Sequence, residues 1–228
     1  MGELSSALSS GKDVKLSADV ELTENLSVEG AIFDGSGKTL TLEKGGVQTF
    51  IEKIDGTIKN LTIDGEGEAT TIWDDVNSEF KSKRGIFNTS NKSTSDVTIE
   101  NVTFLNLGYA FNLYAVESED VNLNLKDCTI EGWSSFTGFD KATFNGCKFK
   151  IGSYFPAGNE FNGAIRPYDE TLFENCDFED GFKVMNDLGT PQTFTFKNCK
   201  YNGVLINNSN VSSLLKISAG NGYTIYVL

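Results

Sequence analysis

The sequence has no histidine and, among 228 residues, only two arginines, three prolines and four cysteines. Without histidine the chain has no His general acid or base, no Ser–His or Cys–His nucleophile pair and no histidine-ligated metal site. No stretch is long and apolar enough to span a membrane. Lys and Arg number 19 against 32 Asp and Glu, and the net charge of −13 repels nucleic acid and anionic membranes. We therefore expect neither nucleic-acid binding nor membrane insertion.

One short stretch, GSGKT at residues 35–39, is similar to the end of a phosphate-binding loop. That loop needs a further glycine at the position of Ile32, and it needs a helix directly after it. Instead, Thr39–Leu42 alternates between polar and apolar residues, which is typical of a strand. The stretch therefore indicates a tight turn between two strands, with Gly35 and Gly37 permitting the reversal.

A repeated nine-residue pattern carries most of the information about the fold. Apolar residues occupy its second, fifth and seventh positions, and the fourth position is Asn, Asp or Gly. Successive copies start 41, 26, 19, 29 and 23 residues apart, which is typical of a solenoid whose turns stack on one another. The six copies are TIKNLTIDG (57–65), TIENVTFLN (98–106), NLKDCTIEG (124–132), TFNGCKFKI (143–151), LFENCDFED (172–180) and TFKNCKYNG (195–203).

The fourth position of each copy must bend the chain. Residues three apart on a regular strand face opposite ways, so the second and fifth positions can both be buried only if the strand breaks between them. Asn, Asp and Gly tolerate the left-handed backbone that such a bend requires. We expect a vertical file of these residues, an asparagine ladder, along the solenoid: Asn60, Asn101, Asp127, Asn175 and Asn198.

Together these patterns predict an all-β fold, a right-handed parallel β-helix of about eight turns that forms a single domain over residues 1–228. A helix over 3–11 caps the N-terminal end, with Leu4, Ala7 and Leu8 on one face. GVLINN (203–208) is expected to begin a further turn. Insertions interrupt the solenoid at about 64–84 and 150–162. A leucine-rich-repeat solenoid and a β-sandwich fit less well, because the leucine consensus and correctly placed hairpin signals are missing.

The helix, the DVKLSADVEL and DGSGKTLTL segments and the N-[VLC]-T-[FI] rungs resemble the parallel β-helix proteins of the pectin-lyase-like superfamily. More narrowly, they resemble uncharacterised secreted or surface proteins of gut anaerobes. The resemblance implies a secreted or cell-surface location. Because the chain begins abruptly with Met1-Gly2, we expect that an original leader was removed. It implies the fold more strongly than any activity, because the fold hosts lyases, hydrolases, adhesins and spacers.

Four cysteines share one inward column of the repeat: Cys128, Cys147, Cys176 and Cys199. No C-x-x-C spacing occurs, so a zinc site is not expected. Stacked rungs lie close enough for a 128–147 or 176–199 disulfide, but parallel side chains in one column make poor bridge geometry. We expect four free thiols that act as small buried apolar side chains.

The resemblance also supplies a catalytic alternative, a lyase that uses Ca²⁺ and a basic side chain on acidic glycans. Arg166 is the weak candidate for that base, although an ion pair with a neighbouring carboxylate is the commoner role of such an arginine. Oxygen ligands for Ca²⁺ would come from Asp64, Glu66 and Glu68, whose spacing matches no known loop. Apart from this possible Ca²⁺ we expect no cofactor, and we expect no metal site.

Aromatic and acidic residues outside the rungs are the candidates for glycan binding. Exposed rings stack on sugar faces, and nearby amides and carboxylates bind the hydroxyls. Packing of these rings against the β-helix wall is the competing interpretation. We predict a monomeric, non-catalytic module that binds a polysaccharide or surface glycan or serves as a spacer; part of a longer adhesin is a further possibility. The candidate residues are Trp73, Asp74, Asp75, Trp133, Tyr154 and Tyr168.

Overall fold

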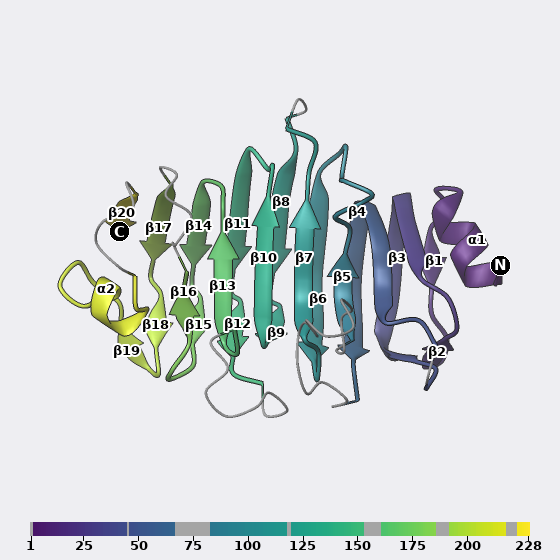
Figure 1. Ribbon diagram of the computed structural model, residues 1–228, viewed down its shortest axis with the longest axis horizontal. Helices are drawn as coiled ribbons and strands as arrows, with labels where there is room; N and C mark the ends of the chain where they lie inside the picture. The colour runs from purple at the N-terminus through teal and green to yellow at the C-terminus, as the bar shows by residue number, and fades with distance from the viewer. Residues whose placement is uncertain are drawn as a thin grey trace, which may run out of the picture.

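The computed structural model describes residues 2–44, 46–66, 83–117, 120–152, 161–185, 192–217 and 223–228. Short strands are stacked along one axis between a helix at the N-terminal end and a helix at the C-terminal end (Figure 1). Among the described residues, every strand pair is parallel except β18–β19. The near strands in Figure 1 run upward, the far strands run downward, and the chain advances from right to left. The coil is therefore a right-handed parallel β-helix of about eight turns, as predicted.

The elements follow one another without long helices between them. The first half of the chain contains α1 (Glu3–Ser9), β1 (Val14–Lys15), β2 (Val20–Leu22), β3 (Leu26–Leu42), β4 (Thr49–Asp64), β5 (Arg84–Phe87), β6 (Val97–Leu105), β7 (Tyr109–Tyr114), β8 (Asn122–Lys126) and β9 (Thr129–Glu131). The second half contains β10 (Trp133–Thr137), β11 (Lys141–Asn145), β12 (Lys148–Lys150), β13 (Ala164–Pro167), β14 (Thr171–Glu174), β15 (Asp177–Phe178), β16 (Lys183–Val184), β17 (Thr193–Lys197), β18 (Lys200–Tyr201), β19 (Val204–Leu205), α2 (Val211–Leu214) and β20 (Thr224–Val227).

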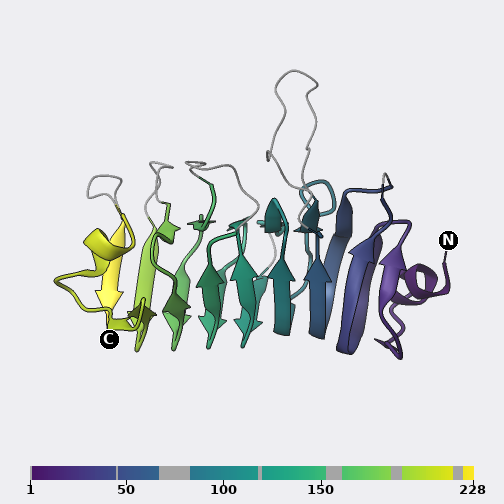
Figure 2. The ribbon, with the colours of Figure 1, turned by 90° about the horizontal axis from the view of Figure 1, so that it is seen from below.

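Equivalent strands of successive turns form separate walls of the coil. The front wall contains β5, β7, β10, β13 and β16, and the wall behind it contains β6, β8, β11, β14, β17 and β20. A third stack joins them at the lower edge through β9, β12, β15 and β18. Seen from below, the front and rear walls stand apart along the whole axis (Figure 2).

The predicted bend is confirmed in every copy of the repeat. The backbone angle φ is positive, between 52° and 53°, at Asn60, Asn101, Asp127, Asn175 and Asn198, and it is 67° at Gly146. The amides also connect turn to turn: Asn101 donates to Asn60 at 3.0 Å, and Asn198 donates to Asn175 at 2.7 Å. The left-handed bend therefore keeps the apolar second, fifth and seventh positions of the repeat facing the interior. The side chain of the residue at the bend links neighbouring turns.

The asparagine ladder is interrupted between Asp127 and Asn175. Gly146 has no side chain there, and a Cβ at this position would lie 2.4 Å from the Asp127 carboxylate oxygen. The neighbouring Asn145 supplies the amide oxygen that the ladder lacks at Gly146, and it accepts from the Asn175 amide at 3.3 Å. The space left by glycine is thus occupied by the carboxylate of the preceding turn.

Many of the acidic residues serve at the corners, where the strand ladder stops and backbone N–H groups need acceptors. The N–H of Ile32 donates to Asp13 at 2.8 Å, and that of Ile151 donates to Glu179 at 2.7 Å. The same arrangement recurs at Asp19, Asp55, Asp96 and Asp169. Part of the strongly acidic composition is therefore explained by backbone capping between turns.

The interior is filled by side chains stacked turn upon turn. Phe173 lies between Phe144 and Phe196, with ring centroids 5.2 and 5.1 Å away and interplanar angles of 20° and 11°. The four cysteines are buried and free. The Cys176 thiol donates to the Phe144 carbonyl at 3.3 Å, and Cys199 repeats this contact to Phe173 at 3.2 Å. Burial raises the pKa of the Cys176 thiol, which keeps it a neutral donor.

The C-terminal end differs from the expectation that residues 203–208 begin a further turn. β19 instead turns back and pairs antiparallel with β18. α2 then places Val211 and Leu215 over the end of the core, and β20 returns to pair in parallel with β17. A four-residue helix is too short to show a helical period, so this cap left no signal in the sequence.

The N-terminal cap is confirmed: α1 spans Glu3–Ser9 and buries Leu8 against the first turns. Within the described ranges, neither helix has the length and hydropathy needed to cross a membrane.

Candidate functional site

The outer surface of the front wall departs from the polar exterior that a solenoid usually presents. Inward residues of this wall, such as Ile86, Phe111 and Phe136, are buried in the main core. Many of the outward positions on β5, β7, β10 and β13 hold rings and both arginines, whereas Thr137 and, on β16, Lys183 are the polar residues expected there. We call this surface the aromatic face; it consists of Arg84, Phe87, Tyr109, Asn112, Tyr114, Trp133, Ser135, Arg166 and the neighbouring Tyr168.

Trp133 organises a small hydrophobic cluster on this outer side, separate from the main core. Its ring meets Phe161 edge-on at 4.9 Å and Tyr109 at 6.1 Å, and it packs with Ala164. The Trp133 side chain is only 2% exposed. A sugar ring cannot stack on a side chain buried to this extent, so the stacking role expected for Trp133 is corrected to one of support. Tyr109 and Phe161, which cover it, remain half-buried.

The two arginines lie against rings of the aromatic face. The guanidinium carbon of Arg166 is 5.1 Å from the Trp133 ring centroid, and that of Arg84 is 4.5 Å from the Phe87 ring centroid. Both side chains are half-buried. Burial lowers the pKa of the Arg84 guanidinium, but an arginine remains a cation at neutral pH. Cation–π contacts hold such side chains in place, so their charge is fixed at the surface.

Polar groups on the same face are oriented and available. Ser135 donates its hydroxyl to the Asn112 amide oxygen at 2.7 Å, which assigns the outward amide nitrogen as a donor. That nitrogen and the phenol hydroxyls of Tyr114 and Tyr168 make no hydrogen bond to other described residues. Burial raises the pKa of Tyr114, so its hydroxyl stays protonated at neutral pH. The face therefore presents several neutral donors beside rings and fixed cations.

One half-buried carboxylate supports the corner that carries Tyr168. Asp169 accepts the backbone N–H groups of Gly138 and Phe139, each at 3.2 Å. Burial raises the pKa of Asp169 to about 6, and the two backbone donors only partly oppose this rise. The corner beside Tyr168 is thus sensitive to pH in the mildly acidic range.

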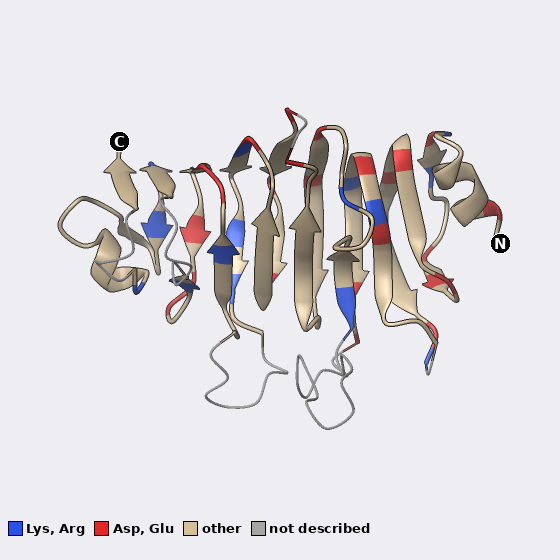
Figure 3. Cartoon of the chain, turned by 45° about the horizontal axis from the view of Figure 1, so that its top comes forward, with Lys and Arg blue, Asp and Glu red and all other residues tan. Residues whose placement is uncertain are grey.

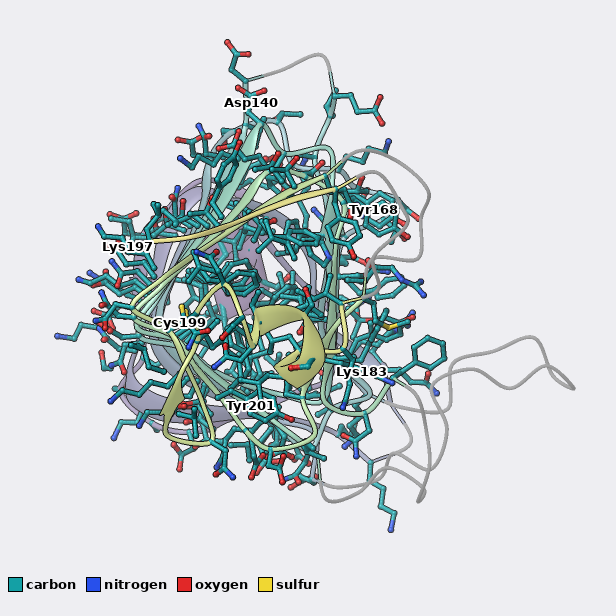
Figure 4. The ribbon with its side chains drawn as sticks, turned by 90° about the vertical axis from the view of Figure 1, so that its left-hand side faces the viewer. Asp140, Tyr168, Lys183, Lys197, Cys199 and Tyr201 are labelled. Carbon is teal, nitrogen blue, oxygen red and sulfur yellow. The ribbon has the colours of Figure 1, made fainter. Side chains whose placement is uncertain are left out.

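The charges on the rest of the surface are arranged differently. β7 and β10 carry no charged residue, whereas charges mark most neighbouring strands and corners (Figure 3). On the rear wall, Lys197 pairs with Glu174 at 2.6 Å and Lys126 with Glu100 at 3.1 Å. Viewed along the axis, Lys197 lies on the opposite side of the coil from Tyr168 and Lys183 (Figure 4). The aromatic face is therefore confined to one side.

The residues expected to bind Ca²⁺ serve other contacts where they are described. Asp64 accepts from the Glu66 backbone and from the Asn106 amide, both at 2.8 Å. The Glu66 carboxylate lies 3.6 Å from the Lys83 ammonium group. Across the described ranges, no three His, Cys, Asp or Glu residues gather in a way that would hold a metal ion. The remaining candidates, Glu68, Trp73, Asp74, Asp75 and Tyr154, lie outside the described residues.

The structure brings Arg166, Trp133 and Tyr168 together, although the sequence suggested them for different reasons. It adds residues that the sequence reasoning missed, namely Arg84, Phe87, Tyr109, Asn112 and Ser135. A signal existed in the sequence, because GIFN (85–88) and YAFNLY (109–114) are short, largely apolar segments that lie between copies of the repeat. Alternation along those strands, aligned in register with WSSFT, would have placed their polar and aromatic residues on one outer face.

Comparisons with family models, with curated proteins and with solved structures found no match. The functional interpretation accordingly depends on the aromatic face and its geometry.

Proposed function

We propose that this protein is a secreted or cell-surface, non-catalytic β-helix module of the pectin-lyase-like type that binds a glycan along the aromatic face. The observation that supports this proposal is the outward placement of half-buried rings beside fixed donors on one wall. Rings bind the apolar faces of sugars, and amide, phenol and guanidinium groups bind their hydroxyls. A strand-built surface holds such groups at fixed spacing, because the wall behind them is rigid.

The polar contacts decide how a bound sugar would be oriented. Asn112 is held by Ser135, and Tyr114 lies at the upper end of the same strand. Tyr168 follows β13 at the corresponding corner, three strands along from β5. Successive strands lie roughly 4.8 Å apart, so donors on neighbouring turns can contact successive sugars of an extended chain.

Binding is tested by screening plant and mucin polysaccharides on a glycan array and measuring positive hits by calorimetry. The double variant Tyr114→Phe and Tyr168→Phe removes only two hydroxyl groups and keeps the rings. We expect its affinity to fall roughly tenfold or more, since each ligand hydrogen bond contributes about 1 kcal/mol. Tyr226→Phe removes a hydroxyl at the distant C-terminal end and is the matched control. Absence of binding by the wild type, or equal loss in the control, would contradict the proposal.

The competing hypothesis is a Ca²⁺-dependent lyase of acidic glycans with Arg166 as the base. It predicts unsaturated products that absorb in the ultraviolet and disappear in Arg166→Ala. The binding proposal predicts no such product with any glycan that binds. The secreted or surface location is tested by immunodetection in the culture medium and the cell-surface fraction.

A further inference from the structure

The charged side chains on the strands of the front wall are all cations. Arg84 and Arg166 lie on β5 and β13, and Lys183 lies on β16. As the structure describes them, β5, β7, β10, β13 and β16 contain no Asp or Glu, although the whole chain has 32 acidic residues against 19 basic ones. A wall without carboxylates on so acidic a molecule suits a ligand that itself carries negative charge.

The two arginines are arranged around one phenol. Arg84 is the register partner of Tyr109 on the neighbouring strand. Arg166 lies two strands from Tyr109 on the other side, and its guanidinium carbon is 5.1 Å from the ring centroid of Trp133, which lies on the strand between them. The only two arginines of the chain therefore approach Tyr109 from opposite directions along the coil.

The electrostatics of Tyr109 agree with this placement. Burial raises the pKa of the phenol, whereas the Trp133 indole N–H and both guanidinium groups lower it, so all three groups lie near the phenol oxygen. The indole N–H nevertheless forms no hydrogen bond of ordinary geometry with the residues that the structure describes. The surroundings of the Tyr109 phenol are thus rich in donors and positive charge.

Neutral donors extend from this place along the same wall. The amide nitrogen of Asn112 is turned outward, because its oxygen accepts from Ser135 at 2.7 Å. The phenols of Tyr114 and Tyr168 lie further along, at the upper ends of β7 and β13. The aromatic face therefore offers cations near Tyr109 and neutral donors beside them.

The positive region is short, because carboxylates flank the wall at both ends of its strands. Glu131 lies directly before β10, and Glu117, Asp169 and Glu170 lie in the corners after β7 and β13. Charges are felt over about 8 Å at physiological ionic strength, so these carboxylates confine the attraction for an anion to the neighbourhood of the arginines. A polymer with a charge on every sugar would also be repelled by the net charge of −13.

We infer that the glycan of the aromatic face carries an isolated anionic group, a sulfate ester or a carboxylate, on an otherwise neutral chain, and that Arg84 and Arg166 bind this group beside Tyr109. This specificity presupposes the glycan binding proposed above. Guanidinium groups bind such oxyanions through two parallel N–H donors. The half-buried rings of Tyr109 and Phe161 pack on the adjacent sugars, and Asn112 binds a hydroxyl group.

A glycan array tests the inference with matched sets, each holding one oligosaccharide in a neutral, a singly sulfated and a singly carboxylated form. We expect at least one charged form to bind roughly tenfold or more tightly than its neutral parent, as calorimetry measures for the best set. This advantage should shrink at high salt, because the facing charges are screened. Polygalacturonate and dextran sulfate, which are densely charged, are expected to bind more weakly than the best singly charged form.

The arginines are tested singly by Arg84→Gln and Arg166→Gln, and the measured quantity is the ratio of the affinities for the charged and neutral forms. Each change should bring this ratio to within about threefold of one, since the charge that distinguishes the two forms is lost. Lys197→Gln removes one positive charge from the opposite side of the coil and is the matched control, which keeps the ratio of the wild type (Figure 4). Melting curves followed by circular dichroism establish that each variant is folded, and the salt dependence of the wild type needs no variant.

The outcomes separate this inference from the glycan binding on which it depends. Equal affinity for the neutral and charged forms would overturn the anionic specificity and leave glycan binding intact, whereas no binding to any glycan would overturn both. A densely charged polymer that binds more tightly than every singly charged form would contradict the isolated charge. Arginine variants that keep the ratio of the wild type would show that the anion binds elsewhere.

Discussion

Two sets of aromatic rings lie on opposite sides of the strand walls, and they pack in different ways. Inside, Phe144, Phe173 and Phe196 stack nearly parallel, with interplanar angles of 20° and 11°. Outside, Phe87, Tyr109 and Trp133 meet edge to face, at 77° and 73°. These three inner rings occupy one column of the repeat and stack on their register partners, whereas buried rings of different columns, such as Phe173 and Phe178, meet at 69°. Of the outer rings, Phe87 and Tyr109 come from different columns, and Tyr109 and Trp133 are register partners at a bulge; both pairs meet at an angle.

This difference shows which aromatic residues the fold requires. Every turn must fill the same interior space, so the same residue type returns at the same position. The outer wall has no such requirement, because polar residues in contact with water would serve the fold equally well. Large rings and both arginines at outward positions are therefore explained better by a role in function than by a role in stabilising the fold.

Removing one inner ring is expected to have the largest effect. Phe173→Ala opens a cavity between two stacked rings and should lower the free energy of unfolding by about 3–5 kcal/mol. Urea unfolding followed by fluorescence or circular dichroism measures the change. Tyr109→Ala, the matched outer variant, removes a half-buried ring and should lower it by only about 1–2 kcal/mol. Similar losses in the two variants would remove the distinction between inner and outer rings.

The bend that separates inner from outer positions is tested at Asn101. Asn101→Ala loses the amide link to Asn60 and puts alanine, which tolerates the left-handed backbone less well than asparagine does, at a φ of 52°, for a loss of about 2 kcal/mol in stability. Asn101→Gly loses the same link but tolerates the backbone, and should lose about 1 kcal/mol. Thermal and urea unfolding compare the two variants. Equal stability of the Ala and Gly variants would show that backbone strain at the bend is unimportant.

The outer corner at Asp169 is expected to respond to pH. Its folded pKa of about 6 lies above the ordinary value of 3.8, so the folded state binds the proton more tightly than the unfolded state does. The stability of the wild type relative to Asp169→Asn should therefore rise as the pH falls from 7 to 4. Because water screens the partly exposed carboxylate, we expect a rise of about 1–2 kcal/mol. Unfolding curves at several pH values measure it, and a flat difference would contradict the assignment.

The smallest predicted effect concerns Ser134, which interrupts the inner column directly behind the aromatic face. Its hydroxyl is buried and has no hydrogen-bond partner among the described residues, while its register neighbours are Phe111 and Ile165. Ser134→Ala should raise the free energy of unfolding by up to about 1 kcal/mol, since an unsatisfied polar group is removed. Ser135→Ala, which breaks the bond to Asn112 on the outer side, is the matched control and should not stabilise. A loss of stability in Ser134→Ala would reveal an unrecognised partner.

The architecture could be predicted because the nine-residue repeat shows which positions are buried and where each turn bends. Its apolar columns, its left-handed fourth position and the N-terminal helix all recur in the structure at the predicted residues. The C-terminal hairpin and α2 could not be predicted, since they occur once and are too short to establish a period. β3 shows the same limitation: Phe33 pairs with Ile58 like a copy of the repeat, but a longer corner at Asp34 hid it.

The candidate site was predictable only in part. The sequence indicated Arg166, Trp133 and Tyr168 as candidate site residues, because arginine and aromatic residues outside the rungs are unusual in an acidic, glycine-rich chain. That Trp133 is buried, and that Tyr109 and Phe161 cover it, follows from packing between turns. Tyr109 and Ala164 lie 24 and 31 positions from Trp133 in the chain, and strand register makes them its neighbours. Insertions of unequal length conceal this register in a single sequence.

The sequence by itself determined which residues face inward, because burial on a strand follows a strict alternation and the bend shifts that alternation at a recognisable residue. The tertiary structure alone decided which outward residues of different turns lie together, and how the two ends of the coil are closed. Both depend on the alignment of successive turns, which is set by hydrogen bonding between strands distant in the chain rather than by any local pattern.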